Sequence, residues 1–202
     1  MTAARTCLMI ALFAVSLAAG LSAPAAAQNK PDSESFLEAI EEQRNNDVVD
    51  LVTKKGRAII NVRGYSGATP LTVAMRKRAT LYVNYLLQNG ADPNLADKNG
   101  DSALMIAARS GYLEGLNTMI IAKASVDAVN RQGETALIIA VQNRHVQAVK
   151  RLLEAGASPK RTDNAGLSAR EYAVRDRRSS EMLKLFDTVK PKPVFVAGPV
   201  IG

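Results

Sequence analysis

The sequence predicts an all-α solenoid of about five helix-turn-helix units, because glycine and the residues around it recur at a fixed spacing. Gly67, Gly100, Gly133 and Gly166 follow one another at intervals of 33 residues, and self-similarity at such a period is typical of repeat proteins. Aromatic residues form only 4% of the 202-residue chain, and Trp is absent. This composition, rich in small aliphatic residues, favours closely packed helices over a β-sandwich or barrel.

Each recurring glycine is followed by a residue suited to begin a helix. Thr69, Ser102, Thr135 and Ser168 stand two residues after the four glycines. Their side-chain oxygens can accept a hydrogen bond from an otherwise unpaired backbone N–H at the helix N-cap. Pro70 then takes the first helical position, where a missing N–H costs nothing. We therefore expect a side-chain cap at the start of every first helix.

Two helices are expected after each cap. The first is built of small apolar residues, which let neighbouring helices approach closely, and the second carries apolar residues along one face at helical period. Gly90 and Gly156 end two of the second helices, at the position where left-handed backbone geometry favours glycine. Lys123 occupies the equivalent position between them. We expect that helix end to be less favourable by up to about 1 kcal/mol, or to be formed differently.

These motifs resemble the repeat of the ankyrin family, in which Gly-x-Thr-Pro-Leu-His opens a unit and Gly-Ala-Asp-x-Asn follows its second helix. Residues 69–72 (Thr-Pro-Leu-Thr) and 90–94 (Gly-Ala-Asp-Pro-Asn) match this motif best. Thr72, Met105 and Ile138 replace the family's usual His, which weakens a hydrogen-bonding device in the turns without changing the expected fold. The resemblance implies helix pairs joined by hairpin-like turns.

A repeat domain is predicted over residues 28–188, and the resemblance covers about 33–188 of it. The first and last units are expected to cap the array, since terminal repeats need a polar outer face. Gly56 and Gly67 are separated by one residue more than the equivalent positions of later units. The predicted units are approximately residues 33–62, 63–96, 97–129, 130–162 and 163–188.

The predicted C-terminal tail, residues 189–202, differs in composition from the repeats. Its three prolines prevent a continued helix, and Val194, Phe195 and Val196 form an apolar segment. Two interpretations stay open: a disordered tail, and an extended segment that docks on the repeats or on a partner.

Residues 1–27 have the pattern of a cleavable signal peptide. Arg5 precedes an apolar stretch too short for an ordinary transmembrane helix, and three alanines supply small residues for cleavage after Ala27. An uncleaved N-terminal anchor is the alternative. Cleavage would remove Cys7, the only cysteine, together with Arg5, which lowers the formal net charge from +7 to +6. The sequence thus predicts a periplasmic or secreted protein without disulfides and without stable membrane insertion.

Catalytic or metal chemistry is not expected. His145 is the only histidine and stands at the start of a second helix, where the family commonly has Gly-His, so we assign it a structural role. It lacks a second His at helical ligand spacing, which argues against zinc. Residues 97–101 resemble a calcium loop, but Ala108 stands where the twelfth-position acid is required. We predict no enzyme activity, no cofactor and no metal.

The resemblance to ankyrin repeats implies a concave binding face made of hairpin tips and first helices, which the stack of units extends. The family's contact positions carry over residue by residue onto this sequence. They are Tyr65, Ser66, Arg76, Lys77, Lys98, Asn99, Asp101, Arg109, Ser110, Arg131, Gln132, Glu134, Gln142, Asn143, Asn164, Arg175 and Asp176.

Three of these residues suggest what the face binds. Arg76, Arg109 and Arg175, which we call the arginine column, share one position of the repeat, and Gln142 fills the place between the last two. Neighbouring members of the column are expected about 10 Å apart. Guanidinium groups bind carboxylates and phosphates bidentately, and Tyr65 could add an apolar anchor. This favours a partner protein with an acidic surface; a solvated basic face that serves solubility is the alternative.

The expected function is a non-catalytic protein-protein interaction module in the bacterial periplasm, which binds a partner through the concave face and could support an envelope enzyme or assembly. One alternative is a secreted effector that binds a host protein, and another is attachment to an anionic envelope surface through the net positive charge. Nucleic acid is not an expected partner, since that compartment contains little of it and aromatic stacking residues are scarce. No motif identifies the partner or the oligomeric state.

Overall fold

The computed structural model describes residues 30–176 and 180–190, so the predicted signal peptide and most of the predicted tail lie outside the described residues. Every described helix belongs to one compact unit, Pro31–Gly202. This part of the chain forms ten α-helices and one 3₁₀ turn, with isolated bridges in place of strands. The predicted all-α repeat solenoid is confirmed.

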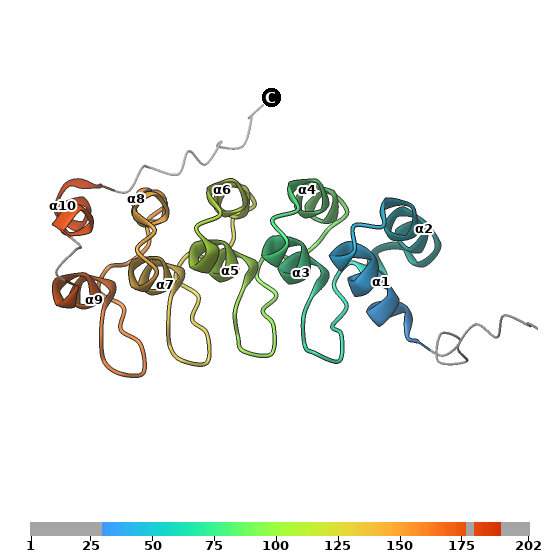
Figure 1. Ribbon diagram of the computed structural model, residues 1–202, viewed down its shortest axis with the longest axis horizontal. Helices are drawn as coiled ribbons and strands as arrows, with labels where there is room; N and C mark the ends of the chain where they lie inside the picture. Colours follow the sequence, from blue (N-terminus) through green and yellow to red (C-terminus); the bar gives the residue numbers. More distant parts are fainter. Residues whose placement is uncertain (1–29, 177–179, 191–202) are drawn as a thin grey trace, which may run out of the picture. The chain divides into compact units, whose positions relative to one another are not determined.

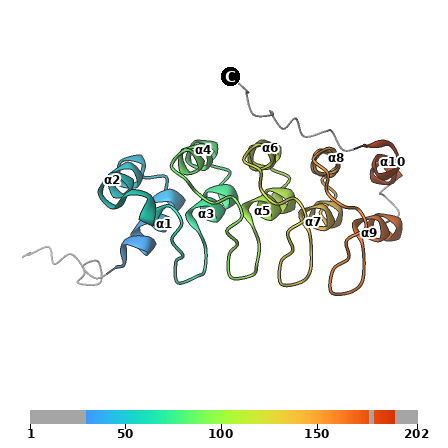
Figure 2. The same ribbon diagram turned by 180° about the vertical axis from the view of Figure 1, so that it is seen from behind.

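The helices form five consecutive pairs arranged in two rows (Figure 1). The row that we call the inner row holds the first helix of each pair, and the outer row holds the second. Long loops extend beyond the inner row, and the view from behind shows the same arrangement (Figure 2). Consecutive inner helices pack on one another, as do consecutive outer helices from α4 to α10. The inner helices are α1 (Asp32–Glu41), α3 (Pro70–Arg76), α5 (Ala103–Ser110), α7 (Ala136–Gln142) and α9 (Ala169–Arg175), and the outer helices are α2 (Asn45–Lys55), α4 (Thr80–Gln88), α6 (Leu113–Ile121), α8 (Val146–Glu154) and α10 (Ser180–Thr188).

The inner helices α3, α5, α7 and α9 begin at the recurring hydroxyl residues. Each hydroxyl oxygen accepts a hydrogen bond from the backbone N–H three residues later, so the predicted caps are confirmed. The Thr72 hydroxyl adds a second bond by accepting from the Thr69 N–H at 2.8 Å. Met105 and Ile138, at the equivalent position of the next two units, are buried apolar residues instead. The four capping residues are Thr69, Ser102, Thr135 and Ser168.

The inner row buries alanines beside larger aliphatic side chains, and the outer row buries leucines against it. Ala107 and Ala140 are fully buried on inner helices, while Leu116 and Leu152 are fully buried on outer helices. Short side chains allow helices of consecutive units to approach closely, and the leucines complete a densely packed layer. Each unit therefore buries apolar surface both between its own two helices and against the neighbouring units.

The loops that precede α3, α5, α7 and α9, which we call the hairpin loops, require glycine for two reasons. Gly100 and Gly133 have φ of 81° and 78°, in the left-handed region. A Cβ atom on Gly100 would also lie 3.0 Å from the backbone N of Arg131, and one on Gly133 would lie 2.8 Å from that of Asn164. Gly166, in the last hairpin loop, has φ of 75°, but a Cβ atom there would meet nothing within 4 Å. The left-handed turn thus favours glycine in every hairpin loop, whereas close contact with the next loop requires glycine only where another hairpin loop follows.

The end of α6 keeps the backbone of its neighbours despite the missing glycine. Lys123 has φ of 59°, and its N–H donates to the Ile120 carbonyl at 3.0 Å, as the N–H of Gly90 does to Leu87 at 3.1 Å. The lysine therefore accepts left-handed geometry, and the helix end is not formed differently.

The extra residue between Gly56 and Gly67 is accommodated directly after α2. A 3₁₀ turn, η2 (Gly56–Ile59), stands where later units have an open turn, and it buries Ile59. The first pair thus joins the array through a connection of its own.

Candidate functional site

A cleft lies between the hairpin loops of the second and third units and the ends of α3 and α5. It has a volume of about 580 Å³. Seven of the predicted contact residues line it, so the structure brings this part of the carried-over set together. We call it the α3/α5 cleft, and its lining residues are Ser66, Arg76, Asp97, Lys98, Asn99, Asp101, Ile106, Arg109 and Ser110.

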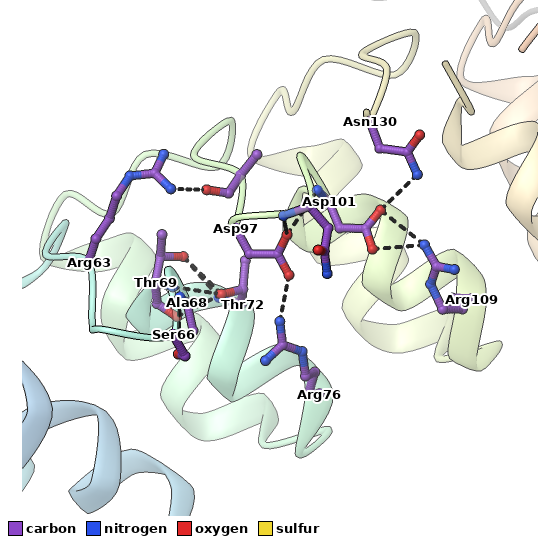
Figure 3. A network of polar contacts seen from close by, with 12 residues as sticks. Arg63, Ser66, Ala68, Thr69, Thr72, Arg76, Asp97, Asp101, Arg109 and Asn130 are labelled. Atoms are coloured by element: carbon purple, nitrogen blue, oxygen red, sulfur yellow. Dashed lines mark hydrogen bonds and ion pairs between the residues drawn. The ribbon is translucent and has the colours of Figure 1, made fainter. Parts of the chain in front are cut away.

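Asp97 organises one side of the α3/α5 cleft. Its Oδ1 accepts hydrogen bonds from the backbone N–H of Asn99 at 2.8 Å and of Asp101 at 3.1 Å, which closes the hairpin loop. Its Oδ2 accepts a bond from Arg76 at 2.6 Å (Figure 3). The Asp97 side chain is only 3% exposed, whereas that of Arg76 is 48% exposed. The carboxylate is thus a buried structural group, and the guanidinium covers it from the solvent side.

Asp101 organises the other side of the cleft. One nitrogen of Arg109 donates to both of its carboxylate oxygens, at 3.0 Å and 2.8 Å. The Asn130 amide donates to Asp101 Oδ1 at 3.0 Å from the next hairpin loop (Figure 3). The same amide nitrogen lies 2.9 Å from Glu134 Oε2. Asp101 therefore links the hairpin loops of the third and fourth units.

These contacts change the expected role of the arginine column. Arg76 and Arg109 each form an ion pair with a carboxylate of the protein, and about half of each side chain stays exposed, 48% and 45%. Their charge is largely balanced within the site, and an external acid would have to share the guanidinium with Asp97 or Asp101. Arg175 lies at the end of α9, close enough to Asp163 to act on its pKa. The column exists as a row of positions, but two of its members also hold the loops.

The remaining predicted residues lie along the same loops and helix ends. Tyr65 is 83% exposed on the first hairpin loop, where its backbone N–H donates to the Glu34 carboxylate. Lys77, which caps the end of α3, pairs with Glu41 at 3.1 Å. The Asn143 amide donates to the Ile139 carbonyl at 2.8 Å and holds the end of α7.

The hairpin loops of the third, fourth and fifth units are joined backbone to backbone. The N–H of Arg131 donates to the Asn99 carbonyl at 3.0 Å, and the N–H of Asn164 donates to the Gln132 carbonyl at 2.9 Å. The Asn164 amide also donates to the Arg131 carbonyl at 2.9 Å. The tips that carry these predicted residues are therefore fixed relative to one another without use of the Arg131 or Gln132 side chains.

Lys98 and Arg131 stand at equivalent tip positions of adjacent hairpin loops. Both residues are exposed, and within the described part of the chain neither side chain forms an ion pair. These two cations contrast with Arg76 and Arg109, which are paired with carboxylates. The unbalanced positive charge of this region lies on the tips rather than in the arginine column.

A recurring side chain in the hairpin loops was not among the predicted site residues. Asp97, Asn130 and Asp163 each stand three residues before the loop glycine, and each Oδ1 accepts from the N–H two and four residues later. The signal was present in the sequence, since the three positions are 33 residues apart. Their side chains hold the loop on which the predicted contact residues stand.

Asp163 shows how strongly hydrogen bonds stabilise the carboxylate at this position of the loop. Burial alone raises its pKa, but hydrogen bonds outweigh that effect and hold the pKa below its ordinary value. The Tyr172 hydroxyl lies 2.6 Å from Oδ2, and the N–H groups of Leu167 and Ala165 bind Oδ1. The bond to Asp163 in turn raises the pKa of Tyr172, with burial adding to it.

His145 connects two units. Its Nε2 lies 3.1 Å from the Arg109 carbonyl, and a Cβ atom on Gly111 would lie 2.6 Å from its Nδ1. The ring therefore fills the space that Gly111 leaves open, in keeping with a structural role. In the part of the chain that the structure describes, no three His, Cys, Asp or Glu side chains are grouped to hold a metal ion, and no helix is long and apolar enough to cross a membrane.

Comparison with known protein families matches most of the repeats. The family described as "Ankyrin repeats (3 copies)" matches residues 83–163 and 104–188, and the one described as "Ankyrin repeat" matches residues 66–98. Together these matches extend from residue 66 to residue 188, more than half of the chain.

Curated relatives match over shorter stretches. Ankyrin repeat family A protein 2 of Mus musculus is 43% identical over 56 residues, which is 28% of this chain and 18% of the relative. The Homo sapiens protein of that name is 44% identical over 54 residues, covering 27% and 17%. Ankyrin repeat domain-containing protein 63 of Mus musculus is 36% identical over 87 residues, covering 40% and 22%. The chain thus spans less than a quarter of the length of each of these relatives.

Proposed function

Because the chain belongs to the ankyrin repeat family, whose repeats form protein-protein interaction modules, we propose that it binds a partner protein without catalysing a reaction and does so in the bacterial periplasm. The binding surface is the row of hairpin loops together with the adjoining ends of the inner helices, which we call the hairpin face. It includes the α3/α5 cleft. A support role for an envelope enzyme or assembly follows from this combination of binding and location.

One observation carries the proposal: the hairpin loops are locked by groups other than their exposed tip side chains. Asp97 and Asn130 close their loops, and backbone hydrogen bonds join adjacent loops. The Lys98 and Arg131 side chains take no part in these contacts. A rigid backbone that presents exposed side chains loses little conformational entropy when a partner binds.

The chemistry of the hairpin face favours an acidic partner surface. Lys98 and Arg131 supply positive charge that no described carboxylate balances through an ion pair. Arg131 can bind a carboxylate bidentately, and Arg76 and Arg109 keep about half of their side chains exposed beside them. Tyr65, 83% exposed, offers an aromatic anchor at the edge of this charged region.

The periplasmic location is supported by the signal-peptide pattern of residues 1–27. A secreted effector that binds a host protein shares this pattern, so cell fractionation of the tagged protein separates the two functions. Attachment to an anionic envelope surface draws on the positive charge. Salt-sensitive co-sedimentation with anionic liposomes would support that function over the protein-binding one.

The decisive test reverses the charge of the hairpin tips. We expect Lys98→Glu with Arg131→Glu to lower recovery of crosslinked partner proteins from cells at least tenfold, measured by quantitative mass spectrometry of the tagged mature protein. The matched control is Lys150→Glu with Lys184→Glu, which makes the same change in net charge at exposed positions of α8 and α10. Equal recovery from both double variants would overturn the proposed role of the hairpin face.

A further inference from the structure

A second hollow lies on the opposite row of the molecule, between the C-terminal ends of α4 and α6. Its volume is about 450 Å³, and none of its lining residues is charged. Ile121 lies in it with 79% of its surface exposed, although large apolar side chains usually avoid such exposure. We call it the outer groove, and it is lined by Asn84, Leu87, Gln88, Ala91, Pro93, Thr118, Ile121 and Ala122.

The next gap along the outer row is closed by a polar bridge. Between α6 and α8, Arg151 Nε donates to Asn117 Oδ1 at 2.7 Å, and its NH1 pairs with Glu154 at 2.6 Å. In the outer groove, Thr118 stands at the position of Arg151 one unit earlier, and its hydroxyl donates to the Glu114 carbonyl of its own helix at 3.0 Å. The outer groove therefore lacks the bridge that fills the neighbouring gap.

We propose that the outer groove binds the apolar C-terminal segment of this same chain, residues 194–201, with Val200 and Ile201 in contact with Ile121. The segment reads Val-Phe-Val-Ala-Gly-Pro-Val-Ile and contains no charged residue, as the groove contains none. Burial of these side chains against Leu87 and Ile121 is the driving force. This inference is independent of the function proposed for the hairpin face.

The position of α10 brings the segment to the correct edge of the molecule. The outer groove lies at the C-terminal ends of α4 and α6, and the chain leaves α10 at the equivalent end, after Thr188. Because consecutive units repeat the same order of helices and loops, the C-terminal ends of the outer helices share one edge of the outer row. The segment reaches the groove along that edge without crossing either row.

The length of chain after α10 is sufficient. At about 8–10 Å between packed helices, the outer groove lies two to three helix spacings from α10, or roughly 20–25 Å. Residues 190–202 in polyproline II conformation, at about 3.1 Å per residue, extend well beyond that distance. Pro191, Pro193 and Pro199 favour such an extended backbone, which lowers the entropy lost on docking. A tethered segment also has a high effective concentration, so weak contacts suffice.

The test uses the mature chain with a photo-crosslinking phenylalanine analogue in place of Val200, one of the two residues placed against Ile121, and mass-spectrometric mapping of the products. We expect crosslinks to α4 and α6 near the outer groove, reduced at least fivefold by Ile121→Asp. The matched control is Leu81→Asp, because Leu81 is an equally exposed apolar residue of α4, at 82%, but does not line the groove. Circular dichroism of each variant checks that the repeats remain folded.

The same experiment distinguishes the C-terminal segment from two other occupants of the groove: a second copy of this chain and a different protein. A mixture of ¹⁵N-labelled and unlabelled protein distinguishes crosslinks within one chain from those between two copies. Crosslinks found only between copies, or equal crosslinking in the Ile121→Asp and Leu81→Asp variants, would overturn the proposal. So would crosslinks that fall on the hairpin face, or that appear only with another protein.

Discussion

A single residue position, three before each loop glycine, determines how the later hairpin loops are held. Asp97, Asn130 and Asp163 make the same pair of backbone contacts, yet they differ in what the rest of the side chain does. Asp97 also accepts from Arg76, and Asp163 accepts from the Tyr172 hydroxyl. Asn130 differs because its side-chain amide can also donate a hydrogen bond. Its amide nitrogen donates to the Asp101 carboxylate of the previous loop.

Tyr172→Phe tests the hydrogen bonding of Asp163. The variant removes a donor to Oδ2, so the pKa of Asp163 is expected to rise toward its ordinary value, as measured by NMR titration of the carboxyl carbon. A lowered folded-state pKa contributes stability above the unfolded-state pKa, and this stability is lost as pH falls through the folded value. The loss of stability between about pH 5 and pH 2 should therefore be smaller in the variant than in the native protein. An unchanged carboxyl pKa would show that the Tyr172 bond does not control it.

The two roles of the loop glycines are separable by one pair of variants. Gly166→Ala should cost about 1–2 kcal/mol of unfolding free energy, because its Cβ meets only left-handed strain. Gly133→Ala should cost about 1 kcal/mol or more beyond that, because its Cβ would lie 2.8 Å from the Asn164 backbone N. Urea denaturation of both variants provides the comparison. Equal losses would mean that the following loop shifts freely to make room.

At the scale of the helix, the sequence predicts most of the beginnings and some of the ends. The caps at Thr69 and Thr135 depend on residues close in sequence, so local chemistry was enough to predict them. The 3₁₀ turn after α2 was signalled only as one extra residue, since its form depends on how Ile59 packs into the core. The pairing of Arg76 with Asp97 could not be predicted, because the two residues are 21 positions apart and meet only through packing of a helix against a loop.

The end of α6 offers a test of helix termination. Lys123→Gly should stabilise the protein by up to about 1 kcal/mol, because glycine adopts the left-handed backbone that the lysine already has there. The reverse change, Gly156→Lys after α8, should destabilise it by a similar amount, since nothing lies within 4 Å of that Cβ position and only backbone strain is added. Denaturant midpoints measure both. No gain from Lys123→Gly would indicate that the lysine side chain contributes stability elsewhere.

For the whole molecule, stability is expected to follow the order of the repeats, because each unit packs only on its neighbours. Inner helices α5 and α7 have a neighbour on both sides, whereas α10 lies at the end and buries only Met182. Beside the hairpin-loop bonds, a bidentate ion pair crosses from the fourth unit to the fifth: Arg144 donates to the two oxygens of Asp176 at 2.7 Å and 3.2 Å. The last helix pair should therefore open before the central ones.

Asp176→Asn tests this coupling between units. Loss of the charged pair with Arg144 should increase hydrogen exchange in α9 and α10 by a few-fold, consistent with the roughly 0.2–1 kcal/mol of a partly exposed ion pair, and leave α3 and α5 unchanged. The control is Asp187→Asn, which removes an exposed pair with Arg170 inside the fifth unit. Exchange rates that rise uniformly along the chain in Asp176→Asn would contradict nearest-neighbour behaviour.

The backbone bonds that join the Asn99, Arg131, Gln132 and Asn164 positions have a consequence for substitutions at the hairpin tips. These bonds require only a backbone N–H or carbonyl from each tip residue, and every amino acid except proline has both groups. Substitutions of Lys98 and Arg131 by residues other than proline can therefore change the exposed side chains of the hairpin tips while the backbone bonds between the loops are kept. A change of partner at the proposed hairpin face would therefore require substitutions of exposed tip side chains alone, with the backbone bonds between the loops retained.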